Sequence, residues 1–307
     1  MTGSFGYPGT GTTVVVPAPG MGPGNWSGAT SAVVHEGAVY LTWRSRRPLT
    51  EGRGVSVIVA RSADGVTFAE VCRIDRNAFG AESFERPVLI FLSNGSARIY
   101  LSCATPQSKH WWIETLTAPS VAELPTGDRA IALPGDDAMA VKDPVLWRDA
   151  TDAERPWRMF VCCHPLTDPG DEDRMTSRLF SSADGLDWRD DGEVLGPTVG
   201  TWDARGARIA AVVPGGGAMP DVIYDGRPDA ESNWFETSGL ARWDGERYCP
   251  VPDLRWQSTV PAHEPDPQGL TDAALRYASA VEFGGAVRWY AEAARPDGAH
   301  DLITWTR

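Results

Sequence analysis

Lysine, paired cysteines and long hydrophobic runs are all scarce in this sequence. Only two of its 28 basic residues are lysines, against 41 acidic residues, and the formal net charge is −13. An extended polyanion such as a nucleic acid, or an anionic membrane surface, would therefore be repelled. No segment is apolar for long enough to span a membrane, and the N-terminal segment lacks the basic start and apolar stretch of a signal peptide. The sequence predicts a cytoplasmic protein with no nucleic-acid or membrane partner.

The number and spacing of the cysteines also argue against a disulfide-stabilised or zinc-binding protein. They are odd in number and show no Cys-x-x-Cys spacing, which argues against a disulfide framework and against a zinc site. We expect all five to be reduced residues of the core: Cys72, Cys103, Cys162, Cys163 and Cys249. The acid-rich segment 168–174 lacks the spacing of an EF-hand loop. No metal and no cofactor are therefore expected.

The composition favours an all-β protein. Glycine (32) and proline (24) are frequent, long helical periodicities are hard to find, and short runs rich in valine, isoleucine, tyrosine and tryptophan recur between turn signals. With 42% hydrophobic residues the chain can bury a substantial core.

A unit of about sixty residues recurs five times along the chain. Each copy has a polar cluster, an apolar run, a turn that usually contains glycine, and a second strand that ends in a polar loop. The copies span residues 25–48, 82–106, 141–165, 201–228 and 271–296. Their markers, separated by 59, 58, 60 and 69 residues, are Trp26, Glu85, Asp143, Asp203 and Asp272. Such even spacing predicts five equivalent modules.

A second pair of strands follows the first in each unit. It is clearest in segments 55–71, 176–195 and 236–251, where an Asp-Gly turn joins two alternating stretches. Four strands per unit is the pattern of a propeller blade. The motif Ser-Ala-Asp-Gly followed by Phe68 or Trp188 resembles an Asp-box hairpin, a structural element. We therefore expect one five-bladed β-propeller domain over residues 1–307, with about two dozen N-terminal residues that close the ring or cover one face.

A propeller places the functional residues at one mouth of its central channel. The innermost strand of each blade starts near the axis, and the second strand returns to the same face. Side chains just before the first strands and just after the second strands should therefore ring that mouth. The substrate-binding candidates there are Trp26, Arg46, Arg86, Lys142, His164, Trp202, Arg205, Asp225, Arg227 and Asp272. They either pair in salt bridges that hold the blades together or are gathered to act on a ligand.

The five repeats and the element Lys142-Asp143-Pro144 ahead of an inner strand resemble the five-bladed propeller glycoside hydrolases. That group contains arabinanases, xylosidases, arabinofuranosidases and invertases. The resemblance implies that a small glycoside or oligosaccharide is cleaved between two carboxyl groups. The chain departs from the family pattern in the first blade, where residues 25–28 include no acid, and in the second, which reads Glu85-Arg86-Pro87. In the third blade Asp143 stands where a glutamate is usual.

From these residues we expect Asp143 and Asp203 to be the acid/base pair, with Glu85 as their modulator or partner. Lys142 would form a blade-to-blade ion pair or keep Asp143 ionised by lowering its pKa. His164 would act as a base, help hold an ion, or be a hydrogen-bonded structural residue.

Three functions stay open. The protein is a divergent glycosidase, a binder of an anionic sugar or carboxylated ligand through its arginines, or a non-hydrolytic enzyme or sugar-binding propeller that uses the same funnel.

Overall fold

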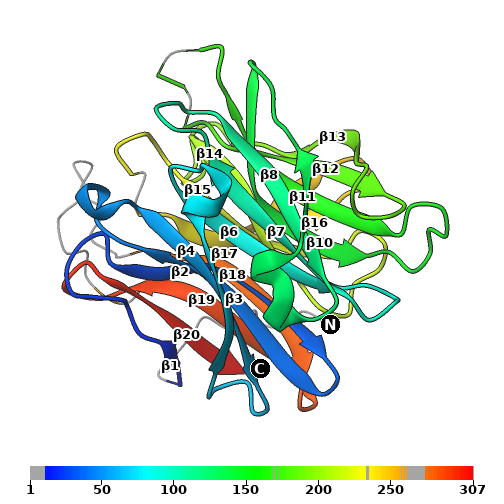
Figure 1. The fold of residues 1–307 in the computed structure, drawn as a ribbon. Helices are drawn as coiled ribbons and strands as arrows, with labels where there is room; N and C mark the ends of the chain where they lie inside the picture. Colours follow the sequence, from blue (N-terminus) through cyan, green and yellow to red (C-terminus); the bar gives the residue numbers. More distant parts are fainter. Residues whose placement is uncertain are drawn as a thin grey trace.

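A computed structural model shows a five-bladed β-propeller (Figure 1). It describes residues 11–168, 170–171, 173–232, 235–256, 258, 260 and 274–306. Within those residues, twenty strands form five antiparallel four-stranded blades, and a parallel bridge between Trp26 and His300 joins two of the blades into one eight-stranded sheet. Three short 3-10 helices lie between strands. The all-β fold class and the propeller architecture predicted from the sequence are confirmed. That residues 1–307 form one domain stays a prediction.

The strands of each blade follow one another from the channel outward. The first blade contains β2 (Trp26–His35), β3 (Ala38–Arg46), β4 (Gly54–Ser62) and β5 (Ala69–Asp75). The second contains β6 (Phe84–Phe91), β7 (Ala97–Ala104), β8 (Trp111–Ala118) and β9 (Asp128–Leu133). The third contains β10 (Met139–Arg148), β11 (Trp157–Pro165), β12 (Thr176–Ser182) and β13 (Arg189–Leu195). The fourth contains β14 (Gly206–Val212), β15 (Val222–Arg227), β16 (Thr237–Trp243) and β17 (Tyr248–Trp256). The 3-10 helices are η1 (Leu49–Glu51), η2 (Arg76–Phe79) and η3 (Val121–Thr126).

The fifth blade joins the two ends of the chain. Its strands β18 (Leu275–Phe283), β19 (Ala286–Ala294) and β20 (His300–Thr306) come from the C-terminal region. The fourth strand is β1 (Thr13–Val16), which pairs antiparallel with β20, and Figure 1 shows the two side by side. Of the two roles expected for the N-terminal segment, the structure thus shows ring closure.

Apolar side chains fill the spaces between blades. Five large clusters each combine residues of two neighbouring blades, and the fifth connects the last blade to the first. Both Asp-box turns support this packing. The Asp64 carboxylate accepts bonds from two backbone N–H groups of its own turn, and Tyr290 of the fifth blade donates to Gly65 O at 2.8 Å. At the turn of the third blade, Gly185 O accepts a hydrogen bond of 2.6 Å from Tyr100 of the second blade. The structural interpretation of this motif is confirmed.

The five cysteines are free, as expected, although Cys249 is only half-buried. Among the described residues, no helix has the length and hydropathy that a membrane crossing requires.

A β-bulge interrupts the innermost strand of every blade. At each bulge the pairing with the second strand shifts, and the first unpaired residues are Ala29, Glu85, Asp143, Ala210 and Tyr277. Three of them, Ala29, Asp143 and Tyr277, have a left-handed backbone with φ of 52, 54 and 52°. Bulges turn side chains away from the regular pleat. These five positions are therefore structurally equivalent around the channel.

Candidate functional site

The Tyr277 hydroxyl joins the two carboxylates that occupy bulge positions. It lies 3.1 Å from Glu85 Oε1 and 3.3 Å from Asp143 Oδ2, and Arg208 Nη1 donates to it at 2.8 Å. All four side chains are at most 5% exposed. Side chains from the innermost strands of four blades thus meet at a single oxygen atom.

Asp143 is held in its ionised form. Burial alone would raise its pKa, but Lys142 and Arg208 outweigh burial and lower the pKa to about 2. Lys142 Nζ lies 3.7 Å and Arg208 Nη1 3.1 Å from Asp143 Oδ2, and the Arg86 backbone N–H donates to Oδ1 at 3.3 Å. Lys142 therefore helps keep Asp143 ionised, while the blade-to-blade ion pair with Asp143 is made by Arg208.

Ion pairs continue from this point around the channel. Arg44 of the first blade contacts Glu85 of the second and lies 3.6 Å from Glu292 of the fifth. Arg208 of the fourth blade reaches both Asp143 of the third and, at 2.8 Å, Asp225 of its own blade. These buried charges cost little only because they are paired. The expected salt bridges that hold neighbouring blades together are thus observed. That the same charged side chains act on a ligand stays a prediction.

The carboxylates of Glu236 and Glu292 complete this ring of ion pairs around the channel on the side of the fifth blade. Arg276 contacts Glu236 and lies 2.9 Å from Glu292, and Arg227 lies 3.3 Å from Glu236. His300 Nδ1 is 2.6 Å from Glu292. Burial would raise the pKa of Glu292, but Arg276 and His300 lower it well below its usual range.

Glu292 also occupies the space where the first blade lacks an acid. Its Oε2 accepts a hydrogen bond of 2.9 Å from the Ala29 N–H, and a Cβ added at Gly28 would lie 1.7 Å from the same oxygen. A carboxylate from β19 therefore lies against the bulge of β2. The absence of an acid in residues 25–28 is compensated in space by another blade.

Trp26 and Arg46 pack against each other at the start of the first blade. The Arg46 guanidinium lies 3.9 Å from the Trp26 ring centroid, and the His300 ring stacks on the tryptophan at 4.3 Å. Burial lowers the pKa of Arg46 to about 9. The role of these side chains in sugar binding stays a prediction.

Asp203, which the sequence predicts to be the acid/base partner of Asp143, lies apart from Asp143. It precedes β14 in a turn, is 1% exposed, accepts from Tyr224 Oη at 3.1 Å and contacts Thr201. No hydrogen bond or ion pair among the described residues joins it to Asp143. Its neighbour Trp202 stacks on Tyr224 with centroids 5.3 Å apart.

The remaining predicted residues divide between the ring and its edge. Asp225 and Arg227 belong to the ring, as described above. Arg205 forms ion pairs with Asp171 at 3.0 Å and Asp173 at 2.6 Å. His164 is buried, with Nε2 3.4 Å from the sulfur of Cys162. Asp272 lies outside the described residues.

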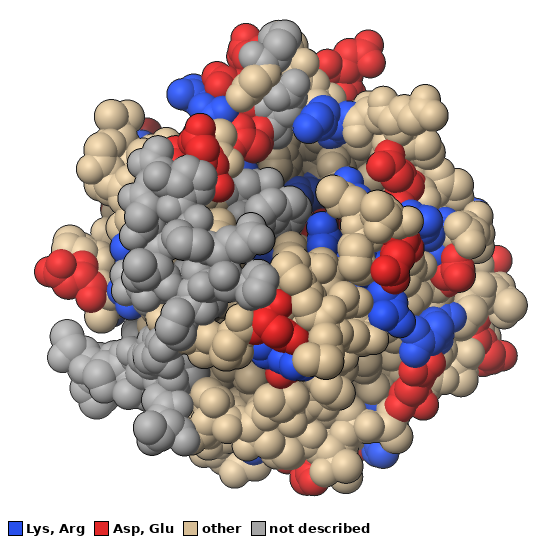
Figure 2. Space-filling model, turned by 90° about the vertical axis from the view of Figure 1, so that its left-hand side faces the viewer, with Lys and Arg blue, Asp and Glu red and all other residues tan. Residues whose placement is uncertain are grey.

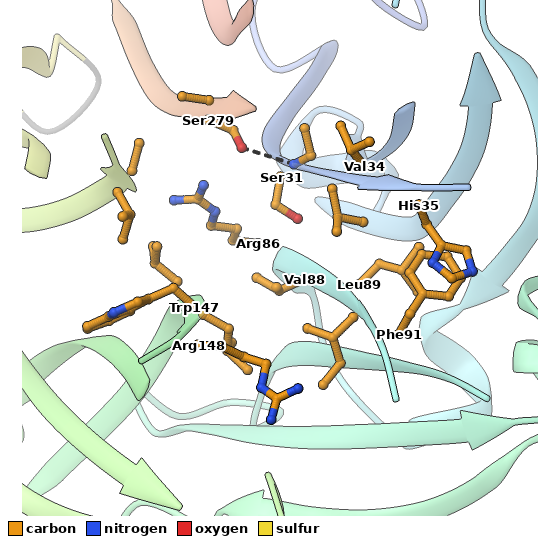
Figure 3. A pocket seen from close by; sticks show the side chains of 18 of the residues that line it. Ser31, Val34, His35, Arg86, Val88, Leu89, Phe91, Trp147, Arg148 and Ser279 are labelled. Carbon is orange, nitrogen blue, oxygen red and sulfur yellow. Dashed lines mark hydrogen bonds between the residues drawn. The ribbon is translucent and has the colours of Figure 1, made fainter. Parts of the chain in front are cut away.

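Arg86 projects toward the other end of the channel. Its guanidinium lines a cavity of about 380 Å³ bounded by the later parts of the five innermost strands, as Figure 3 shows. The sequence had placed this side chain among the residues of the opposite mouth.

Three important residues were missed by the sequence analysis: Arg208, Glu236 and Tyr277. A signal for the first was present, because a basic residue stands one to three positions before an apolar run at Lys142, Arg208 and Arg276. Aligning the repeats on this basic residue would have put Tyr277 opposite Asp143. Glu236 lies just ahead of β16 and carries no comparable pattern.

The surface in Figure 2 shows basic side chains inside a hollow of one face of the molecule. Among the described residues, no three histidine, cysteine, aspartate or glutamate side chains gather so that they could hold a metal ion. The described residues therefore form a site of paired carboxylates, guanidinium groups and one phenol.

Comparison with known proteins identifies the fold. No family model matches the sequence, and no curated protein matches it. Solved structures do match. A glycosyl hydrolase from Bacteroides ovatus has a TM-score of 0.65 at 14% identity, covering 99% of this chain and 95% of its own. An alpha-L-arabinofuranosidase from Lactobacillus brevis has a TM-score of 0.66 at 12% identity, covering 91% and 90%.

A beta-1,2-mannobiose phosphorylase from Listeria innocua has a TM-score of 0.60 at 13% identity, covering 97% of this chain and 92% of its own. At such identities the likeness concerns the backbone, and function depends on the site. The resemblance inferred from the sequence is confirmed at that level: this chain has the five-bladed propeller fold of glycoside hydrolases and phosphorylases.

Proposed function

We propose that this protein is an enzyme that acts on a small glycoside in the axial channel, with Asp143 and Glu85 as its carboxylates. The observation that carries the proposal is the Tyr277 hydroxyl, which hydrogen-bonds both carboxylates on a propeller with the fold of glycoside-active enzymes. A pair of carboxyl groups at the reacting bond is the minimal equipment of most glycosidases.

Asp143 is the ionised member of this pair. With a pKa near 2 it cannot donate a proton at neutral pH. Its role is to stabilise the positive charge that develops on the sugar ring as the glycosidic bond breaks. The proton must come from another group, and Glu85 and the Tyr277 hydroxyl are the nearest oxygen acids. Burial raises the pKa of Tyr277, so that its hydroxyl stays a neutral hydrogen-bond donor.

The separation of the carboxylates favours a retaining outcome. Two hydrogen bonds of 3.1 and 3.3 Å, even if placed end to end, keep Glu85 Oε1 and Asp143 Oδ2 closer together than the roughly 6.5 Å at which inverting enzymes begin. Little room is left for a water molecule between them.

A second candidate is a propeller that binds a sugar, or transforms it without hydrolysis. It is favoured by the bulge positions themselves, because Ala29 and Ala210 occupy two of the five and Tyr277 a third. The carboxylates at the other two positions, Glu85 and Asp143, are both paired with arginines. The two candidates predict different behaviour of the unmodified protein.

The test is release of free sugar from a panel of aryl and natural furanosides and pyranosides. Asp143→Asn and Glu85→Gln should each abolish turnover while binding of the same glycoside persists. Asp149→Asn is the matched control, because Asp149 is also buried and pairs at 3.3 Å with Arg158, which is not among the groups that meet at the Tyr277 hydroxyl. Asp203→Asn tests the pairing that the sequence suggested.

Each result separates the alternatives. Loss of turnover in Asp203→Asn but not in Asp143→Asn would refute the assignment. Saturable sugar binding by the wild type without any product would establish the second candidate instead.

A further inference from the structure

The cavity at the far end of the channel is separate from the Tyr277 site. In every innermost strand its lining residues lie at or after the bulge, as with Ser31, Val88, Val145 and Ser279. The groups that meet at the Tyr277 hydroxyl lie at or before the bulges. Figure 3 shows Arg86 at one end of this cavity and Arg148 at another. The cavity volume of about 380 Å³ is within the range of small-molecule sites.

Arg86 is a buried cation that makes no direct ion pair among the described residues. It is 1% exposed, and its Nη2 donates to Ala278 O at 3.1 Å. Its Nε and Nη1 have no hydrogen-bond partner among the described residues, and no carboxylate there lies within ion-pair distance of it. Burial lowers its pKa, while the more distant carboxylates of Asp143 and Asp225 limit the fall to about 10, so the guanidinium is charged at neutral pH. An unpaired buried charge is costly unless a ligand compensates it.

The surroundings of Arg86 are suited to an anion with an apolar body. Ser279 accepts a hydrogen bond of 2.9 Å from the Ala32 N–H, which leaves its own O–H hydrogen available to a ligand. The described residues that line the cavity include no acid, and their other charged or titratable side chains are the exposed Arg148 and the half-buried His35. The walls are apolar, with Val33, Val88, Ile90, Val145, Leu146 and Trp147.

We propose that this cavity binds a small molecule with one carboxylate and an apolar body. The carboxylate receives hydrogen bonds from Arg86 and Ser279, and the body lies against the valine and tryptophan walls. A single guanidinium and a single hydroxyl suit one negative charge, and charge-assisted bonds of this kind are the strong ones. This site goes beyond the proposed glycoside chemistry, because it uses other residues at the opposite end of the channel.

The experiment is calorimetric titration of the full chain at pH 7 with benzoate and hexanoate, and with benzamide and hexanamide as uncharged controls. We expect one-to-one binding of a carboxylate at least about tenfold tighter than of its amide. Arg86→Met removes the charge and should abolish the difference between acid and amide. Val88→Phe fills the cavity from β6, keeps Arg86, and should weaken both probes by at least about tenfold.

Arg148→Gln is the control at the exposed rim and should change affinity by less than about threefold. Thermal unfolding of each variant checks that it is folded, and the wild type and Arg148→Gln, but not Arg86→Met or Val88→Phe, should gain stability with added benzoate. Three results would overturn the proposal: no binding of either carboxylate at about 10 mM, equal binding of acid and amide, or full binding by Val88→Phe. None of these results depends on whether the protein cleaves glycosides.

Discussion

Replacing Arg208 with methionine should reveal how strongly the charged ring stabilises the fold. Arg208 is 1% exposed, its Nη1 lies 3.1 Å from Asp143 Oδ2, and its Nη2 lies 2.8 Å from Asp225 Oδ2. Its guanidinium also lies 3.8 Å from the Tyr277 ring centroid. Methionine retains much of the volume but removes the charge.

The expected cost follows from what the substitution leaves behind. Asp143 keeps Lys142, but Asp225 loses the sole ion pair it makes within the described residues and retains only hydrogen bonds from Ser238 and the Tyr277 N–H. Removing one partner of a buried pair costs about 3–5 kcal/mol. Because all three charged groups are buried, no discount for solvent screening applies. We expect a loss of about 4 kcal/mol in the free energy of unfolding at pH 7.

The loss should depend on pH in a definite direction. Without the guanidinium, less charge opposes the effect of burial on Asp143, and we expect the pKa of Asp143 in the folded variant to rise above its unfolded value of about 3.9. Protonation then favours the folded variant, so its deficit relative to the wild type should shrink as the pH falls toward that raised pKa.

Urea unfolding followed by tryptophan fluorescence at pH 7 and pH 5 measures both effects. Arg178→Met is the matched control, because Arg178 pairs with Asp190 at 2.8 Å on the surface, and it should cost less than about 1 kcal/mol. A loss below about 1 kcal/mol for Arg208→Met at pH 7 would refute the reasoning. So would a loss of equal size at both pH values, because the carboxylates could not then be its source.

Three further outcomes are expected. Gly28→Ala should lower the melting temperature by several degrees, since its Cβ would meet Glu292 Oε2 at 1.7 Å, whereas Gly217→Ala, with nothing within 4 Å, should leave it unchanged; equal effects would contradict this. Deleting residues 1–17 removes β1 and should abolish cooperative thermal unfolding, because the fifth blade loses its outer strand; an unchanged transition would show that ring closure is dispensable. Tyr277→Phe should reduce turnover of any cleaved glycoside by about 100-fold with an unchanged circular dichroism spectrum, and a smaller effect than that of Arg148→Gln would remove Tyr277 from the site.

The strand pairs were predictable because they are local. The first repeat, residues 25–48, contains β2 and β3, and the second, residues 82–106, contains β6 and β7. In each case an apolar run, a glycine-containing turn and another apolar run lie within about two dozen residues, which is the sequence signal of a hairpin. The Asp-box turns were recognisable for the same reason, since the aspartate binds backbone groups two and three residues on.

The site was harder to predict because it depends on register and on contacts between blades. Asp203 and Asp272 were chosen as acids ahead of apolar runs, but the channel residues are set by where each bulge falls, and the bulges begin inside β14 and β18. Arg208 and Tyr277 lie inside these strands, and an alignment of the repeats on the acids gives them no distinct role. The partners of Glu85 come from other blades, with Arg44 from the first and Tyr277 from the fifth.

The five bulges also divide the channel into two ends with opposite electrostatic requirements. At the Tyr277 end every carboxylate of the ring already has a cationic partner, so a charged ligand would have to displace an existing buried pair, at a cost of several kcal/mol. A neutral sugar could instead add its hydroxyl groups to the ring without breaking it. At the Arg86 end the guanidinium makes no direct ion pair among the described residues, and a neutral ligand would not supply one. Since the Arg86 backbone N–H also binds Asp143, one residue holds the carboxylate of the first end and presents the guanidinium of the second. We therefore expect this channel to accommodate two ligands of different charge, one neutral and one anionic.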